Sequence, residues 1–134
     1  MSQPRMVLAR QFLDDAQHLL DQGRLRSATS RAYYATYHAT VALFEKSGFK
    51  PSSFIGKSGR PARIWEHPII TKQFFHEFVR RRKLFPWRTG QEIRRLYARP
   101  IAADYDQYAA LVEADVQVLF TSAQDIVAVA ERWV

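Results

Sequence analysis

Two long runs of helical apolar spacing, separated by a single glycine, set the fold of the first third of the chain. In the first run apolar side chains recur every three or four positions, at Met6, Phe12, Leu13, Ala16, Leu19 and Leu20. Gly23 is expected to end this helix, and a second helix is expected from about Leu25 to Lys46, with Gly48 terminating it. Because the link is so short, the two helices are predicted to pack antiparallel as a hairpin.

The remainder of the chain is also predicted to be helical, after one loop. Residues 49–63 are rich in Pro, Gly and Ser and are expected to lack regular structure, which makes the segment either mobile or functional. A third helix is expected from about Pro68 to Leu84, because proline is favourable in a first helical turn.

Two shorter signals predict the C-terminal part. Thr89 and Glu92 fit a capping box that would begin a short fourth helix ending near Tyr97. A last helix is expected to begin near Ala103 or Asp104, where helical apolar spacing resumes. The predicted fold class is therefore all-α: an antiparallel bundle of four to five helices, forming one domain over residues 1–134.

Composition narrows the class of protein further. The chain has 134 residues, of which 47% are hydrophobic, enough for one packed core and too few for two comfortable domains. It has no cysteine, which excludes disulfides, thiolate nucleophiles and thiolate metal sites. No stretch approaches the roughly 18 uncharged apolar residues of a membrane span. A cytoplasmic protein without membrane contact is expected.

The positive charge is concentrated in the middle of the chain. Residues 46–99 contain 14 Lys and Arg but only three acidic residues, within a chain of net charge +7. Such a basic segment favours a polyanionic partner, RNA or another nucleic acid before a membrane, although a solvated charged surface is the plain alternative. The candidate RNA-binding residues are the cations of the loop and of the end of the third helix: Lys57, Arg60, Arg63, Arg80, Arg81 and Arg82.

One arginine and one histidine share a face of the second predicted helix. His38 follows Arg31 by seven positions, which returns to nearly the same azimuth about 10 Å further along the axis. Arginine can clamp a phosphate and histidine can move a proton near neutral pH. The structural alternative is that Arg31 pairs with Asp104 or Asp106 while His38 hydrogen-bonds inside the bundle.

The other three histidines are weaker candidates for a catalytic role. His18 and His76 are interpreted as surface or satisfied bundle residues, and His67 as a residue that caps the third helix or helps to bind an anion there. A zinc site needs three or four clustered ligands, and no His pair here has ligand spacing next to a carboxylate. No metal site and no cofactor are expected.

The run from Ser30 to Ala39, Ser-Arg-Ala-Tyr-Tyr-Ala-Thr-Tyr-His-Ala, resembles the signature helix of the HEPN superfamily, an Arg followed four to six residues later by a His. It is most similar to small stand-alone prokaryotic HEPN proteins of toxin–antitoxin type. Two further segments resemble the family in order along the chain: His67-Pro68-Ile69-Ile70 with Phe74, Phe78 and Val79, and Arg99 with Ala103-Asp104-Tyr105-Asp106. The resemblance spans about residues 8–123.

The resemblance implies a metal-independent endoribonuclease, often the toxin of a toxin–antitoxin pair, that leaves 2′,3′-cyclic or 3′-phosphate ends. It implies Arg31 and His38 as catalytic residues, in a homodimer that brings two signature helices together. The residues implied as possible support for the site are Tyr34, Tyr37, His67, Asp104 and Tyr105. In a related toxin group a tyrosine two positions after the His is modified by a nucleotidyltransferase antitoxin, but that position here is Thr40.

Three functions remain open from the sequence. The first is the RNase, and the second is a non-catalytic HEPN module that binds a partner protein, typically a minimal nucleotidyltransferase, or a nucleotide. The third is a helical nucleic-acid-binding protein that acts through residues 46–99 alone. Tyr34 and Tyr37 would stack on bases in the first, or simply fill a protein interface, the commoner role for tyrosine.

Overall fold

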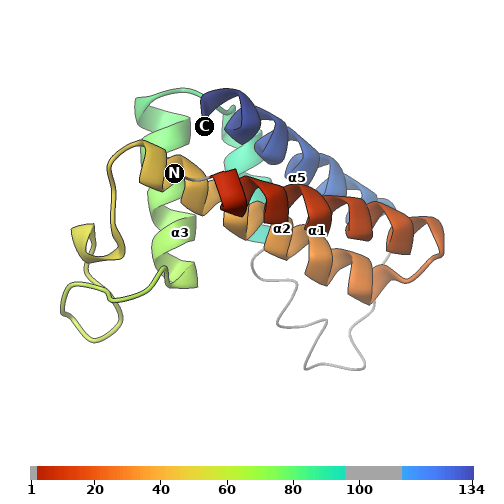
Figure 1. The fold of residues 1–134 in the computed structure, drawn as a ribbon, viewed down its shortest axis with the longest axis horizontal. Helices are drawn as coiled ribbons and strands as arrows, with labels where there is room; N and C mark the ends of the chain where they lie inside the picture. The colour runs from red at the N-terminus through yellow and green to blue at the C-terminus, as the bar shows by residue number, and fades with distance from the viewer. Residues whose placement is uncertain (1–2, 96–112) are drawn as a thin grey trace.

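The computed structural model describes residues 3–95 and 113–134, and this part of the chain is all-α, as predicted (Figure 1). The α-helices are α1 (Gln3–Asp21), α2 (Leu25–Lys46), α3 (His67–Phe74) and α5 (Glu113–Trp133). Residues 87–95 are also helical. Helices α1, α2 and α5 run alongside one another, while α3 crosses them near the end of α2 (Figure 1).

The predicted α1–α2 hairpin is confirmed, including the bounds of its second helix. Gly23 has φ +74° and Gly48 has φ +88°, left-handed conformations that glycine adopts without steric cost at helix ends. The amides of Gly23 and Arg24 donate hydrogen bonds to the carbonyl oxygens of Leu20 and Leu19 at 3.0 and 2.9 Å. The turn thus provides hydrogen-bond donors for carbonyl groups at the end of α1 and reverses the direction of the chain.

Helix α2 packs against both α1 and α5, so it is the central helix of this layer. Small side chains permit the close approach, and the buried alanines on these three helices are Ala9, Ala16, Ala28, Ala32, Ala35, Ala39, Ala42, Ala123 and Ala130. Arg10 of α1 also pairs with Glu131 of α5. The face of α2 that carries the signature run is therefore built on a well-packed support.

Aromatic rings join the end of α2 to the segment that follows. Phe44 is fully buried, and its ring centroid lies 5.2 Å from Trp65 in a stacked arrangement and 5.1 Å from Phe78. Phe49 and Phe54 meet the same ring edge-on at 6.1 and 6.0 Å. This cluster attaches residues 49–65 to the bundle.

Residues 49–63 form a loop, as predicted, but they are not entirely without regular structure. They contain a 3₁₀ turn, Pro51–Ser53, and an antiparallel bridge between Ile55 and Pro61. Two backbone hydrogen bonds close the bridge, from Gly56 to Arg60 at 2.8 Å and from Ala62 to Phe54 at 2.9 Å. The cations Lys57, Arg60 and Arg63 belong to this short closed loop, which we call the basic loop (residues 57–63).

The third helix begins as predicted, with Pro68 in its first turn, but changes its winding. Residues Phe75–Arg81 form a π-helix, in which Arg82 donates to the carbonyl of Glu77 at 2.9 Å. The helical segment ends at Arg81, three residues before the predicted Leu84, and Lys83 takes a left-handed φ of +53° just beyond it. The Leu84 and Phe85 amides then donate to the carbonyl of Phe78.

The predicted capping box at Thr89 is also wrong. The helix begins two residues earlier, directly after Pro86, and the Thr89 amide donates to the Pro86 carbonyl at 3.0 Å. Gly90 serves packing instead, because a Cβ there would lie 2.6 Å from Cδ2 of Phe75. The predicted start of the last helix, near Ala103 or Asp104, lies outside the described residues, where α5 is seen from Glu113.

Within the described ranges, none of the helices has the length and apolarity needed to cross a membrane. The same ranges hold no group of three or more His, Asp or Glu side chains placed to bind a metal ion.

Candidate functional site

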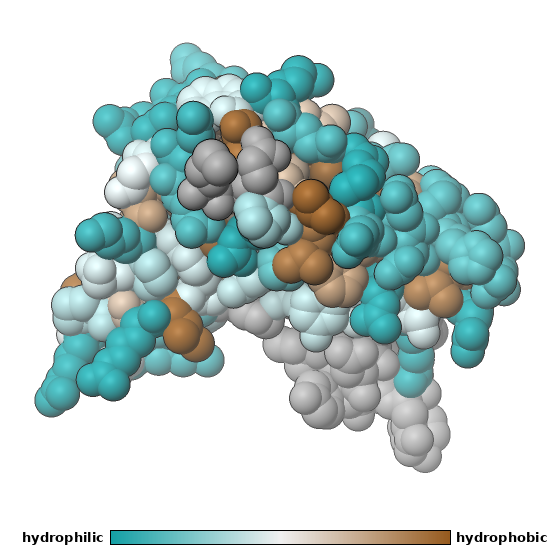
Figure 2. Space-filling view, in the orientation of Figure 1, coloured by the Kyte–Doolittle hydropathy of each residue, from teal (hydrophilic) through white to brown (hydrophobic). Residues whose placement is uncertain are grey.

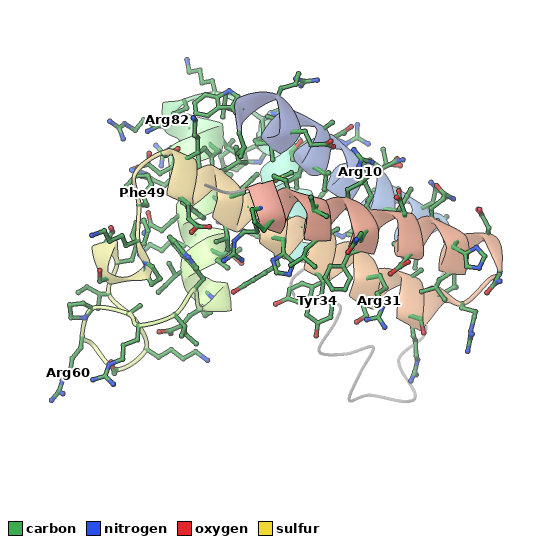
Figure 3. All side chains as sticks on the ribbon, viewed as in Figure 1. Arg10, Arg31, Tyr34, Phe49, Arg60 and Arg82 are labelled. Carbon is green, nitrogen blue, oxygen red and sulfur yellow. The ribbon has the colours of Figure 1, made fainter. Side chains whose placement is uncertain are left out.

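The signature run lies on one uninterrupted helix, so the spacing of Arg31 and His38 is that of a regular α-helix. The two residues are separated by about 10 Å along the axis of α2. Arg31 is exposed, and no described residue forms a hydrogen bond or ion pair with it. Figure 3 shows Arg31 and Tyr34 projecting from the same side of α2. The arginine is thus open to an external anion.

His38 is half-buried between α1 and α2. Its imidazole stacks on the ring of Phe12, with centroids 5.7 Å apart and planes within 4°. Tyr37 meets the imidazole edge-on at 5.3 Å. Arg5, in the first turns of α1, places Nη1 3.2 Å from Nδ1 of His38. The ring is therefore fixed on one face, on one edge and at one nitrogen.

The contact with Arg5 decides which nitrogen of His38 carries the proton. A guanidinium has only N–H donors, so Nδ1 of His38 must accept, and the neutral ring carries its proton on Nε2. Burial lowers the pKa of His38 below its ordinary value, and the positive charge of Arg5 lowers it further. Among the described residues, none is hydrogen-bonded to Nε2, which leaves this nitrogen for a ligand.

The pKa shift of His38 also bears on stability. Because the folded-state pKa lies below that of the unfolded chain, the unfolded state takes up the proton first as the pH falls. The neutral side chain carries no such penalty above its ordinary pKa of about 6.5. His38 therefore lowers the stability of the fold progressively as the pH falls below that value.

Three tyrosines of the signature run lie near His38 and differ in burial. Tyr33 is buried, and burial raises its pKa, with Tyr34 and Tyr37 adding to the effect. Tyr34 is 39% exposed and its ring lies 5.4 Å from Phe12. Tyr37 is half-buried against His38. Tyr34 is thus the tyrosine of this run with free surface, while Tyr37 supports the imidazole.

Three predicted support residues cannot be placed at the site. His67 begins α3, but its side chain is outside the described part of the chain. Asp104 and Tyr105 fall within residues 96–112, which also lie outside the described residues, as does Asp106, the alternative partner for Arg31. The structure therefore brings together His38, Tyr37 and Tyr34, with Arg31 two turns away on the same helix.

The predicted RNA-binding cations form two separate groups. The basic loop lies beside the start of α3, whereas Arg82 lies at the far end of the same helical segment (Figure 3). Lys57, Arg60 and Arg63 are all exposed. They are therefore exposed cations of one short loop, distinct from the group at the end of α3.

The second group of cations, at the end of the α3 segment, is partly engaged in contacts within the fold. The carboxylate of Glu77, with a side chain only 8% exposed, lies 3.0 Å from Nη1 of Arg81 and 3.8 Å from Nε of Arg82. Arg82 also lies over the ring of Trp133 at 5.7 Å, joining the π-helix to the end of α5. Of these three arginines, Arg80 is the exposed one without such a contact among the described residues.

Two neighbours of His38, Arg5 and Phe12, were not predicted from the sequence. Residues equally distant from the turn face each other in an antiparallel hairpin, and His38 lies 15 positions after Gly23. Arg5 lies 18 positions before it, and a side chain as long as arginine covers the difference. Glu45, which pairs with Nε of Arg5 at 2.9 Å, completes the arrangement. The antiparallel geometry of the hairpin could therefore have predicted these two residues as neighbours of His38.

An apolar surface adjoins the site. Val7 and Leu8 of α1 are 56% and 41% exposed, and apolar surface lies along the outward face of this helix (Figure 2). Leu8 lies one turn from both Arg5 and Phe12, on the stripe that faces His38. Leu8 and Tyr34 of α2 thus give the site an apolar border.

Comparison with known proteins agrees with the fold. The sequence profile of the HEPN domain matches residues 5–56, which include α1, α2 and both Arg31 and His38. A UPF0332 protein of Thermotoga maritima is 29% identical over 124 residues, covering 92% of this chain and 83% of that protein. The all-α fold and the signature run on α2 agree with this likeness, and the chain is similar to the HEPN domain over residues 5–56.

Proposed function

We propose that this protein belongs to the HEPN family and is a metal-independent endoribonuclease of the cytoplasm, acting as the toxin of a toxin–antitoxin pair. The observation that carries the proposal is the contrast between the two signature residues. Arg31 is exposed with no described partner, while His38 is fixed by its neighbours with Nε2 left open. A free cation and an oriented imidazole suit a phosphate ester better than they suit a structural role.

The chemistry uses the RNA's own 2′-hydroxyl as the nucleophile. That oxygen attacks the adjacent phosphorus, the bond to the 5′-oxygen breaks, and a 2′,3′-cyclic phosphate forms. Arg31 stabilises the charge that develops on the phosphoryl oxygens, and His38 carries a proton for one of the two reacting oxygens. No step requires a bound metal or another cofactor.

A homodimer supplies the site with its second copy of each residue. HEPN domains often dimerise, and the exposed apolar border formed by Leu8 and Tyr34 lies next to His38. A two-fold axis through this region would set two α2 helices antiparallel. Arg31 of one subunit would then approach His38 of the other, which removes the separation of about 10 Å within one chain.

Mixing two inactive variants tests this arrangement. Arg31→Ala and His38→Ala should each be inactive alone, but a heterodimer contains one site in which both residues are intact. After random exchange at equal concentrations, the mixture should recover about a quarter of the wild-type cleavage rate. If each chain holds its own complete site, the mixture stays inactive.

The matched control is the double variant Arg31→Ala/His38→Ala mixed with wild type. If each site is shared between the two subunits, a heterodimer of wild type and double variant has no intact site. Added double variant should therefore inhibit cleavage by the wild type. Sedimentation equilibrium should show a dimer at micromolar concentration, and a monomer there would exclude the shared site.

RNA binding is expected to rest on the basic loop. Changing Lys57, Arg60 and Arg63 to Gln removes three exposed charges that hold no other part of the fold. Each phosphate contact to a single strand contributes about −0.7 to the slope of log K against log salt, so the slope should flatten by about 2. Fluorescence anisotropy with a labelled RNA at several salt concentrations measures it.

Two comparisons sharpen this measurement. Arg24→Gln, an exposed arginine at the turn between α1 and α2, should leave the slope unchanged. Arg80→Gln tests the far end of the α3 segment without disturbing the Glu77 ion pairs. A loss of slope in Arg80→Gln but not in the loop variant would move the RNA surface to that end.

The second candidate function is a non-catalytic HEPN module that binds a minimal nucleotidyltransferase or a nucleotide. The observation in its favour is that Arg5 occupies Nδ1 of His38, so the resting imidazole is not a free base. A growth assay distinguishes the two functions: expression of wild type should arrest growth, and His38→Ala should not. Equal arrest by both proteins would support the module.

A further inference from the structure

Among the described residues, Arg5 is the charged residue in contact with His38, and most of its hydrogen-bonding capacity is unused there. Nε lies 2.9 Å from Oε1 of Glu45, and Nη1 lies 3.2 Å from Nδ1 of His38. A guanidinium has five N–H groups, so three remain after these two contacts. The side chain is 30% exposed, which allows a ligand to reach them.

The remaining N–H groups suit a phosphate. Arginine binds phosphoryl oxygens through pairs of parallel N–H groups, and the unused ones on Arg5 include both on Nη2. Glu45 fixes the guanidinium from the opposite side by taking Nε. A phosphate bound here would lie beside the imidazole of His38, whereas Arg31 lies two helical turns away on the same chain.

We propose that Arg5 is a second phosphate-binding residue of the site, and that an RNA phosphate bound to it allows His38 to take up a proton. The inference rests on the proposed function for its substrate, RNA. Without phosphate, the Arg5 cation faces Nδ1 and opposes an imidazolium. With phosphate, the anion offsets that charge, and the guanidinium turns toward the phosphoryl oxygens and releases Nδ1.

The proton balance then fits the reaction. The protonated ring carries protons on both nitrogens and can give the Nε2 proton to the leaving 5′-oxygen as its bond to phosphorus breaks. The ring is left neutral with its proton on Nδ1. His38 thus acts as the general acid, and it is charged only when a phosphate is present to be cleaved.

Few other groups are placed to influence protonation of the His38 imidazole. Tyr37 meets the ring edge-on, and Glu45 acts on it through Arg5. In the described parts of α3 and α5, no charged group is in hydrogen-bond or ion-pair contact with His38. Coupling between phosphate and protonation should therefore depend on Arg5.

An NMR titration of the histidine ring tests the proposal without cleavage. The probe is sulfate, whose charge does not change near neutral pH, compared with chloride at equal ionic strength. In the wild type, sulfate should raise the pH midpoint of His38. In Arg5→Gln the midpoint should be higher from the start, and sulfate should no longer move it. Arg5→Lys should retain part of the coupling.

Controls separate this role from a structural one. Glu45→Gln breaks the ion pair between α1 and α2 but keeps the cation, so the sulfate effect should persist. His18 and His76, both exposed, report any general effect of the salt. A short single-stranded DNA, which lacks the 2′-hydroxyl and resists cleavage, should reproduce the sulfate effect.

The proposal fails if sulfate moves the His38 midpoint equally in wild type and Arg5→Gln, or moves it in neither. In the cleavage assay, Arg5→Gln should lower kcat/KM on the order of 10- to 100-fold. A protein in which sulfate shifts His38 but RNA remains uncut would contradict the proposed function while it leaves the role of Arg5 intact.

Discussion

Replacing His38 with alanine is expected to reduce RNA cleavage by a factor on the order of 10² to 10⁴, the usual contribution of a general acid or base. The imidazole is the proton carrier of the proposed site, and its Nε2 has no hydrogen bond to any described residue. Single-turnover cleavage of a labelled RNA measures the chemical step directly. Affinity for RNA should change little, because the phosphate contacts are expected to come mainly from the basic loop.

Two other single substitutions in this protein serve for comparison with His38→Ala. Arg31→Ala should also remove most turnover, whereas His18→Ala, an exposed histidine on α1, should behave as wild type. Circular dichroism should show the same helical content in all three variants. Cleavage that persists in His38→Ala would move the chemistry away from the signature helix and favour the partner-binding module.

Replacing Phe44 with alanine is expected to lower the free energy of unfolding by about 3–5 kcal/mol. The side chain is fully buried and contacts the rings of Trp65 and Phe78, with Phe49 and Phe54 edge-on. The deletion leaves a cavity where the end of α2 meets residues 49–65. Proteins of this size have only about 5–15 kcal/mol in total, so the variant should be close to unfolding.

Urea denaturation followed by circular dichroism measures this loss. Val7→Ala, at an exposed apolar position on α1, should change stability by no more than about 0.5 kcal/mol. A loss below about 1 kcal/mol in Phe44→Ala would show that the aromatic cluster does not hold residues 49–65 to the bundle.

Much of the fold followed from the sequence because local signals agreed with packing. Gly23 and Gly48 marked helix ends that only glycine reaches without strain, so α2 was predicted with its observed bounds. The π-helix was not predictable, because its wider winding places Glu77 against Arg81 and Arg82, and that ion-pair network exists only in the folded chain. The capping box at Thr89 failed because Pro86 begins the helix earlier.

The site was predicted only where its residues lie on one helix. Helical periodicity placed Arg31 and His38 on one face of α2, and the structure describes that helix as continuous. Contacts across the hairpin depend on side-chain length and rotamer, which periodicity does not give. Arg5 therefore escaped prediction, although it fixes the tautomer of His38.

The most direct measurement is the chemistry of the RNA ends produced by purified protein in the presence of EDTA. If Arg31 and His38 cleave RNA through its 2′-hydroxyl, the wild type should cut single-stranded or looped RNA and leave 2′,3′-cyclic or 3′-phosphate ends. The same sequence as DNA should remain intact, and so should RNA treated with His38→Ala. Cleavage that requires added Mg²⁺, or products that carry a 3′-hydroxyl, would contradict the assignment.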